Sequence, residues 1–256
     1  MKKPFVIGVI LVLVLGAVGA GYYMYRQIQF QKENVPAAVE ISQIERSQQV
    51  APGILGGTQA ATQENVQVPP ELNLKMTFYS QAPFGDWSEP WQEACEEASI
   101  LLIANTYYNH NWTRENFRDE ILKLVTWENQ NFGDFKNTNA VQISRMLQEY
   151  LGLKSVIHAD PTYEDVQQVL ARGHLIVMTF AGKLIGNPNY RNGGPVYHAM
   201  VIKGYKSGGK VITEDVGTKN GEDYVYPWTT LQRALHDYTD PIENGKKLMI
   251  EVLPPN

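Results

Sequence analysis

The hydrophobic pattern of the chain changes its period at about residue 174, and this change constrains the fold more than any other feature. Before it, apolar residues recur at helical spacing in residues 91–109, 114–127 and 139–151. After it come apolar runs typical of strands, in residues 174–180, 197–205, 210–217 and 246–253. Helices followed by an antiparallel sheet predict an α+β fold.

Shorter elements complete this pattern. Residues 72–80 alternate as a strand does, and residues 155–159 and 224–227 are further short strands. Thr162 opens a capping box, so a helix is expected from there to Gly173, and another over residues 228–237. The helix of residues 139–151 should follow Thr138 as its cap and end at Gly152. The folded domain is thus predicted over residues 72–256.

An uncharged N-terminal segment precedes the domain. Lys2 and Lys3 are followed by a stretch from Pro4 to Tyr25 without any charged residue, close to the roughly 20 residues that a membrane-spanning helix needs. The two lysines favour an N-terminus inside the cell. We expect residues 1–26 to be a single-pass transmembrane signal-anchor. The alternative is a signal peptide cleaved after the small residues 18–20. Either way, the domain is expected outside the cytoplasm, on the cell membrane or secreted.

Residues 27–71 connect the expected anchor to the domain. They are rich in Gln, Glu, Ala and Pro and keep no strand or helix period, and Pro69 and Pro70 mark their end. We expect them to form a flexible linker.

Charge and motifs exclude several classes of function. The formal net charge is −5, and no basic stripe interleaved with aromatic residues is present, so nucleic acid is not expected as a partner. The sequence holds no HExxH motif and no Cys/His cluster with metal-ligand spacing. It also holds no GxGxxG motif and no P-loop. We therefore expect no metal and no cofactor.

Cys95 is the only cysteine of the chain. It cannot form an intrachain disulfide, so in an exported protein it stands out as a reactive group. It lies near the start of a predicted helix, where the positive end of the helix dipole favours a thiolate. A nucleophilic cysteine needs a histidine, which is expected from a different element.

His198 is the best candidate for that partner. It opens a strand directly after a Gly-Gly-Pro loop, and the following strand carries Asp215. In antiparallel neighbours, these two residues can lie at the same sheet end, where Asp215 would orient the imidazole. Taken alone, His198 would be read as a strand histidine and Asp215 as a turn carboxylate. The other histidines, in loops or at element ends, are His110, His158, His174 and His236.

An acyl-transfer site also needs donors for an oxyanion. The Cys95 backbone N–H is one. Gln81 and Gln92 are the candidates for the second, and we favour Gln81 because it follows a strand.

These residues resemble a known family. The segments YSQAPFGDW, EACEEAS, GNPNYRNGGPVYHAMVIKGY, ITEDVG and ALHDY look like those of stand-alone peptidases of the bacteriocin-processing (double-glycine leader) type, a branch of the papain-like cysteine peptidases. The resemblance covers residues 72–253. It implies a papain-like fold with Gln81 as oxyanion donor, Cys95 as nucleophile, His198 as general base and acid, and Asp215 as orienting group.

One motif departs from the family. Many members carry Cys-Gly-Pro, whereas Glu96 and Glu97 follow Cys95 here. Carboxylates beside a thiol oppose its ionisation. On a helix both should project to other faces, so we expect a small effect. The chain also lacks transporter machinery, so a double-glycine leader substrate does not follow.

The sequence therefore predicts a cysteine hydrolase acting on peptide or amide bonds, with a peptide or peptidoglycan-type substrate. Residues 186–195 are expected at the cleft rim, and Trp87, Asn187 and Tyr197 are candidate substrate-binding residues. Two alternatives remain open. One is a catalytically inactive papain-like module that binds peptides or cell-wall fragments. The other is a cell-wall amidase or transamidase using the same residues.

Overall fold

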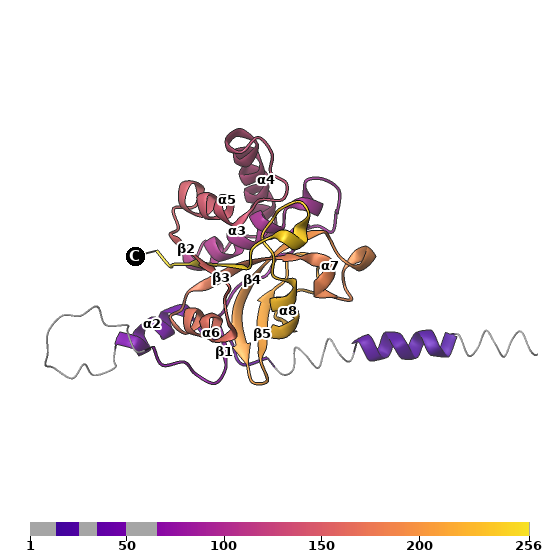
Figure 1. Ribbon diagram of the computed structural model, residues 1–256, viewed down its shortest axis with the longest axis horizontal. Coiled ribbons are helices and arrows are strands. Elements are labelled where there is room, and N and C mark those ends of the chain that lie inside the picture. Colours follow the sequence, from indigo (N-terminus) through magenta and orange to yellow (C-terminus); the bar gives the residue numbers. More distant parts are fainter. Residues whose placement is uncertain (1–13, 26–34, 50–65, 256) are drawn as a thin grey trace, which may run out of the picture. The chain divides into compact units, whose positions relative to one another are not determined.

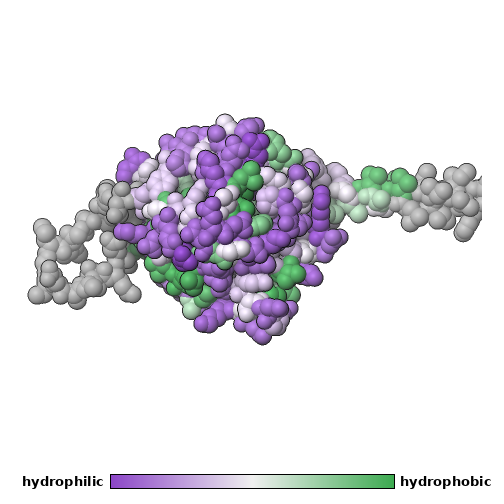
Figure 2. Space-filling model, turned by 90° about the horizontal axis from the view of Figure 1, so that it is seen from above, coloured by the Kyte–Doolittle hydropathy of each residue, from purple (hydrophilic) through white to green (hydrophobic). Residues whose placement is uncertain are grey.

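The computed structural model describes residues 14–25, 35–49 and 66–255. The chain divides into two units, residues 1–35 and 36–256. In the first unit residues 14–25 form a helix of exposed, mostly apolar residues, coloured largely as hydrophobic in Figure 2. The rest of the predicted anchor, residues 1–13 and 26, lies outside the described residues. Within the described ranges, no helix is both long enough and apolar enough to cross a bilayer.

The second unit is built on a seven-stranded sheet, and every pair of its strands is antiparallel. Its order is β2-β7-β3-β4-β5-β6, with the short β1 paired to β4. The strand bounds are β1 Leu72–Asn73, β2 Ser155–Ala159, β3 Leu175–Ala181, β4 Tyr197–Lys206, β5 Lys210–Glu214, β6 Tyr224–Pro227 and β7 Leu248–Val252. The predicted antiparallel sheet in the second half of the chain is therefore confirmed.

Helices cover both faces of this sheet. Every residue of β3 is buried, and so is all of β4 except its last residue. Burial of successive residues requires cover on both faces, because side chains of a strand alternate between them. Figure 1 shows α3, α4 and α5 on one side and α2 and α6 on the other. The helix bounds are α2 Ile41–Gln49, α3 Cys95–Tyr107, α4 Arg114–Asn131, α5 Ala140–Arg145, α6 Tyr163–Ala171, α7 Gly182–Ile185 and α8 Trp228–Ala234.

The central helix α3 begins at the cysteine. The sequence predicted one helix over residues 91–109, but Ala94 has φ −93° and ψ 34°, outside the helical range. This break separates a 3₁₀ turn, Trp91–Glu93, from α3. From Cys95 to Asn105 every residue of α3 is buried, as expected for a helix enclosed on all sides. The break makes Cys95 the first residue of the helix.

Other elements also differ from their predicted form. The helix expected over residues 114–127 continues to Asn131, and the one expected over residues 228–237 ends at Ala234. Only Leu72 and Asn73 of the predicted strand 72–80 pair with β4 as a ladder. The helix expected over residues 139–151 is α5 followed by a π-helical segment, Met146–Tyr150. Its cap is Asn139 rather than Thr138, because the Asn139 side chain accepts from the first-turn N–H groups.

The structure differs from the predicted linker of residues 27–71 over residues 36–49. Val39 forms a β-bridge with Leu74, and Lys75 pairs with Glu40 at 2.6 Å. Ile41 and Ile44 of α2 pack against the core. These isoleucines recur at helical spacing, and their burial stabilises the segment as a helix on the domain. The polar composition of the rest of the segment did not indicate this.

Candidate active site

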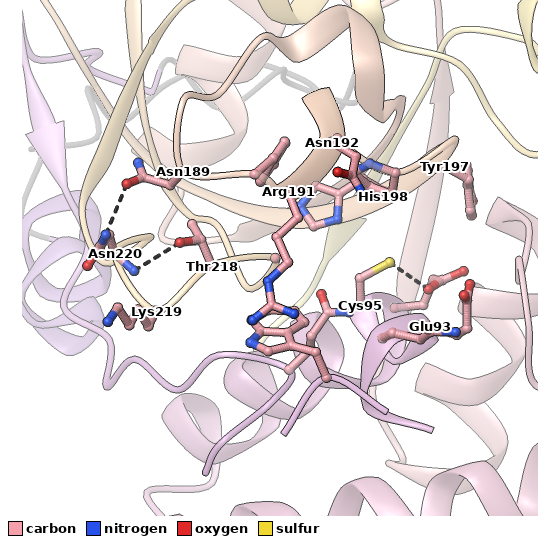
Figure 3. Close-up of a pocket in the computed structure, with 18 of the residues that line it drawn as sticks. Glu93, Cys95, Asn189, Arg191, Asn192, Tyr197, His198, Thr218, Lys219 and Asn220 are labelled. Atoms are coloured by element: carbon pink, nitrogen blue, oxygen red, sulfur yellow. Dashed lines mark hydrogen bonds between the residues drawn. The ribbon is translucent and has the colours of Figure 1, made fainter. Parts of the chain in front are cut away.

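A cleft of about 660 Å³ lies where the start of α3 meets the start of β4. Asn137 and three further segments complete its wall, residues 81–93, 189–195 and 217–220. Figure 3 shows Cys95 and His198 facing this cleft from opposite elements, with Arg191 and Lys219 on the loops around it. The sheet therefore supplies the histidine and the helix supplies the cysteine.

His198 and Asp215 form a buried pair. The His198 Nε2 atom lies 2.8 Å from Asp215 Oδ1, and the side chains are 1% and 0% exposed. The register explains the pairing, because Val201 of β4 lies opposite Glu214 of β5, which brings Asp215 to the same end of the sheet as His198. With Nε2 engaged by the carboxylate, Nδ1 is the ring nitrogen left for chemistry.

Asp215 is held by several donors. Its Oδ2 accepts from Asn187 Nδ2 at 3.0 Å, Tyr190 OH at 2.7 Å and Tyr226 OH at 2.5 Å. Burial alone would raise the pKa of Asp215, but the charge of His198 and these hydrogen bonds outweigh it, so that its pKa lies below the ordinary value. The group stays a carboxylate and accepts the hydrogen of His198 Nε2, which fixes the orientation of the ring.

The His198 ring is also fixed from two sides. The Tyr190 ring meets it edge to face, with centroids 5.4 Å apart. Gly217 lies so close that an added Cβ would fall 2.6 Å from His198 Cε1. The Gly217 N–H donates to Asp215 Oδ1 at 3.1 Å. A glycine is needed here because the backbone itself packs on the imidazole.

Cys95 contacts the backbone of β4 at Ala199, the residue that follows His198. The Ala199 N–H donates to Cys95 Sγ at 3.3 Å. As the first residue of α3, Cys95 also has a backbone N–H that no helical carbonyl accepts. The residue is only 5% exposed. Burial raises the pKa of the thiol well above its ordinary value, and the charge of Glu96 raises it further.

The expectation that Glu96 would point away from the thiol is wrong. Cys95 Sγ donates to Glu96 Oε2 at 2.9 Å, and Thr138 N–H donates to the other oxygen at 2.8 Å. Glu96 occupies the first turn of α3, where a side chain can fold back over the helix start, and the Thr138 backbone holds it there. Glu97, by contrast, lies near Glu128, and burial raises the pKa of both.

Gln81 lies in the cleft wall, as the sequence predicted for an oxyanion donor. Its backbone N–H donates to Val216 O at 2.9 Å, and its Nε2 donates to Trp91 O at 2.9 Å. Because an amide nitrogen carries two hydrogens, one N–H remains available. Gln92 lines the same cleft.

The three candidate substrate-binding residues occupy different places. Trp87 lines the cleft, with the Arg191 guanidinium 6.0 Å from its ring. Tyr197 also lines it, but its hydroxyl donates to Thr138 O at 2.8 Å. Asn187 does not line the cleft as expected of a substrate-binding residue. It is buried, and its side-chain amide donates hydrogen bonds to Asp215 and Tyr226.

Comparison with known proteins identifies the family. The sequence pattern of the Peptidase_C39 like family matches residues 73–240. The chain belongs to this family. Its members are cysteine peptidases, and the fold is papain-like, with Cys95 on the helical part and His198 on the antiparallel sheet. The predicted resemblance is thus confirmed. No curated protein matches the chain significantly.

Three solved structures are similar at low identity. A protein from Bacillus anthracis described as a C39-like peptidase is 14% identical, with a TM-score of 0.45, over 70% of this chain and 95% of its own. Interpain A, a cysteine protease of Prevotella intermedia, is 16% identical, with a TM-score of 0.32, over 67% and 66%. UfSP from C. elegans is 14% identical, with a TM-score of 0.33, over 73% and 34%.

Sequence reasoning missed the residues that support the site. Tyr190, Tyr226 and Gly217 carry no motif of their own, and they meet Asp215 and His198 only through the sheet register. One signal was available for Tyr190, because it lies in the loop that was expected to form the cleft rim. In the part of the chain that the structure describes, no group of three or more His, Cys, Asp or Glu side chains could hold a metal ion.

Proposed function

We propose that this protein is a cysteine hydrolase that cleaves peptide or amide bonds. The observation that carries the proposal is the buried His198–Asp215 pair, 2.8 Å apart, at the cleft where Cys95 begins α3. A histidine oriented by a carboxylate and a cysteine at a helix start are the parts of an acyl-transfer site. Cys95 is its nucleophile, His198 its base and acid, and Asp215 its orienting group.

The reaction follows from this placement. The thiol proton passes to His198 Nδ1, and the thiolate attacks the substrate carbonyl carbon. The resulting oxyanion receives hydrogen bonds from the Cys95 N–H and the remaining Gln81 amide N–H. Collapse expels the amine, which takes the proton from His198 and leaves a thioester. Water, deprotonated by His198, then hydrolyses the thioester and restores the thiol.

The cleft lining supports a peptide as substrate. It presents amide side chains that can pair with a peptide backbone, those of Gln81, Gln92, Asn137, Asn189, Asn192 and Asn220. Trp87 and Tyr190 add aromatic surface. Such a wall suits a polar, extended chain, either a peptide or the stem peptide of peptidoglycan.

Product analysis tests the proposal. The full chain is incubated with a peptide library and, separately, with muropeptides, and the products are identified by mass spectrometry. We expect cleavage by the wild type and a loss of about 1,000-fold or more in Cys95→Ala. Cleavage that survives in Cys95→Ala would contradict the mechanism. New products from muropeptides alone would favour the cell-wall amidase or transamidase.

A second function is favoured by the Glu96 contact. A carboxylate at the sulfur opposes ionisation of the thiol, which suits an inactive module that binds peptides or cell-wall fragments. Such a module would retain intact peptides without turnover at every pH, whereas a hydrolase would release products.

We also propose that residues 1–26 hold the domain on the extracytoplasmic side of the cell membrane. Lys2, Lys3 and the uncharged stretch Pro4–Tyr25 support this. Mass spectrometry of the mature N-terminus in membrane fractions tests it. An intact N-terminus in membranes is expected, and a chain that starts near Gly21 would mean a cleaved signal peptide.

A further inference from the structure

The carboxyl group of Glu96 is fixed at the reacting sulfur. Its Oε2 accepts the Cys95 thiol hydrogen at 2.9 Å, and its Oε1 accepts Thr138 N–H at 2.8 Å. The residue is 1% exposed, so water does not compete for either oxygen. Figure 3 shows this contact as a dashed line from the Cys95 sulfur.

Charged groups from several elements face Glu96. His198 and Tyr197 approach from β4, Glu128 from α4, and Glu97 and Cys95 from its own helix. His198 alone among them can carry positive charge. Burial raises the pKa of Glu96 to about 7, although the hydrogen bonds and the His198 charge work in the other direction. Its protonation therefore changes near neutral pH.

We propose that Glu96 is a further catalytic residue, whose protonation state decides whether Cys95 can act as a nucleophile. As a carboxylate it accepts the thiol hydrogen and keeps the sulfur neutral. As a carboxylic acid it donates its own proton in a hydrogen bond to the thiolate. This inference deepens the proposed function and takes its mechanistic meaning from it.

The two protonation states of Glu96 differ in whether the thiol can lose its proton. With Glu96 protonated, the thiol proton moves from Sγ to His198 Nδ1, which gives a thiolate, an imidazolium and a neutral acid that points at the sulfur. With Glu96 ionised, the same transfer would place a thiolate 2.9 Å from a buried carboxylate. Two adjacent anions in a low-dielectric site repel strongly, so the proton stays on the sulfur.

Alkylation of Cys95 by iodoacetamide against pH tests this without any substrate. An ordinary thiol reacts faster as pH rises. For the wild type we expect the opposite over the range in which Glu96 ionises, with a rate about tenfold lower at about pH 8 than at about pH 6. A rate that rises steadily with pH, as for a free thiol, would overturn the proposal on the wild type alone.

A charge variant sharpens the test. Glu96→Gln keeps an oxygen for Thr138 N–H and a permanent N–H donor for the thiolate. Its alkylation rate should show no fall and should exceed that of the wild type about tenfold at about pH 8. Glu93→Gln, which removes another carboxylate of the cleft, should follow the wild type. Coincident profiles for Glu96→Gln and the wild type would contradict the proposal.

Failure of this inference can be told from failure of the proposed function. If the alkylation profiles behave as expected but no peptide is cleaved, only the hydrolase function fails. If peptides are cleaved while the profiles coincide, Glu96 has a structural role alone. Circular dichroism of each variant at both pH values checks that the fold is intact.

Discussion

Gly217 shows how closely single residues define this site. A Cβ there would lie 2.6 Å from His198 Cε1, closer than Cβ atoms approach other heavy atoms, and 3.1 Å from Nε2. The imidazole is packed between this backbone and the Tyr190 ring. The position of the base therefore depends on the absence of a side chain.

Replacing Gly217 by alanine should displace the imidazole. We expect kcat/KM on a cleaved peptide to fall about 100-fold, because a shift of about 1 Å in a catalytic group can cost this much. The matched control is Gly208→Ala, in the turn between β4 and β5 with φ +80° and open space around it. Gly208→Ala should lower stability slightly and leave kcat/KM unchanged. Equal activity in both variants would refute the proposed packing.

Replacing a tyrosine that donates a hydrogen bond to Asp215 by phenylalanine should leave the Asp215 carboxylate less stabilised. Tyr226→Phe removes a hydrogen bond of 2.5 Å to Oδ2 and keeps the ring. Because hydrogen bonds hold the pKa of Asp215 down, its pKa should rise and the acid limb of the pH–rate profile should move to higher pH. Tyr224→Phe, on the same strand, is the control and should leave that limb in place.

The sequence predicts Cys95, His198, Asp215 and Gln81 as one site. The structure brings Cys95, His198 and Gln81 to one cleft and pairs Asp215 with His198. Their roles in catalysis stay predictions. The Glu96 orientation was not predictable, because helical spacing describes where Cβ atoms point and not how a longer side chain folds back. The Thr138 N–H that donates to Glu96 comes from a loop 42 residues later in the sequence.

At the scale of elements, the main difference between prediction and structure is the helix α2, which precedes the predicted domain. Ile41 and Ile44 of α2 pack on the domain, and Gly173 leaves room for them, since a Cβ there would lie 3.3 Å from Ile41 Cγ2. Strands such as β3 and β4 were predictable from continuous apolar runs. The helix α2 was not, because only two of its residues are apolar enough to reveal a buried face.

Removing the apolar face of α2 should destabilise the domain. We expect the double variant Ile41→Ala/Ile44→Ala to lower the free energy of unfolding by about 2 kcal/mol, since both side chains are partly buried. Urea unfolding followed by circular dichroism measures this. The exposed Ser42→Ala on the same helix serves as control. An unchanged midpoint in the double variant would show that α2 contributes nothing to stability.

At the scale of the whole molecule, one carboxylate ties the sheet to its neighbours. Glu251 on β7 contacts His158 on β2 at 2.7 Å, Arg172 at 2.8 Å and His174 at 2.5 Å. Burial would raise the pKa of Glu251, but these three donors lower it to about 2. The cluster lies outside the residues that line the cleft, so it bears on stability rather than on chemistry.

The Glu251 cluster predicts a pH dependence of stability. Since the pKa of Glu251 falls from 4.5 to about 2 on folding, its carboxylate stabilises the fold fully above about pH 4.5. That contribution is lost as pH falls toward 2. Glu251→Gln should cost about 2 kcal/mol at neutral pH, and its deficit should shrink with acidification. Thermal melts at several pH values test this, and a deficit independent of pH would contradict it.

The central claim is that Cys95 is a nucleophile activated by His198, and covalent labelling tests it most directly. The full chain is treated with a peptide carrying an electrophilic carbonyl at its C-terminus, and the modified residue is mapped by mass spectrometry. We predict one adduct, on Cys95, formed far more slowly in His198→Ala. An adduct elsewhere, or a rate unchanged in His198→Ala, would contradict the account.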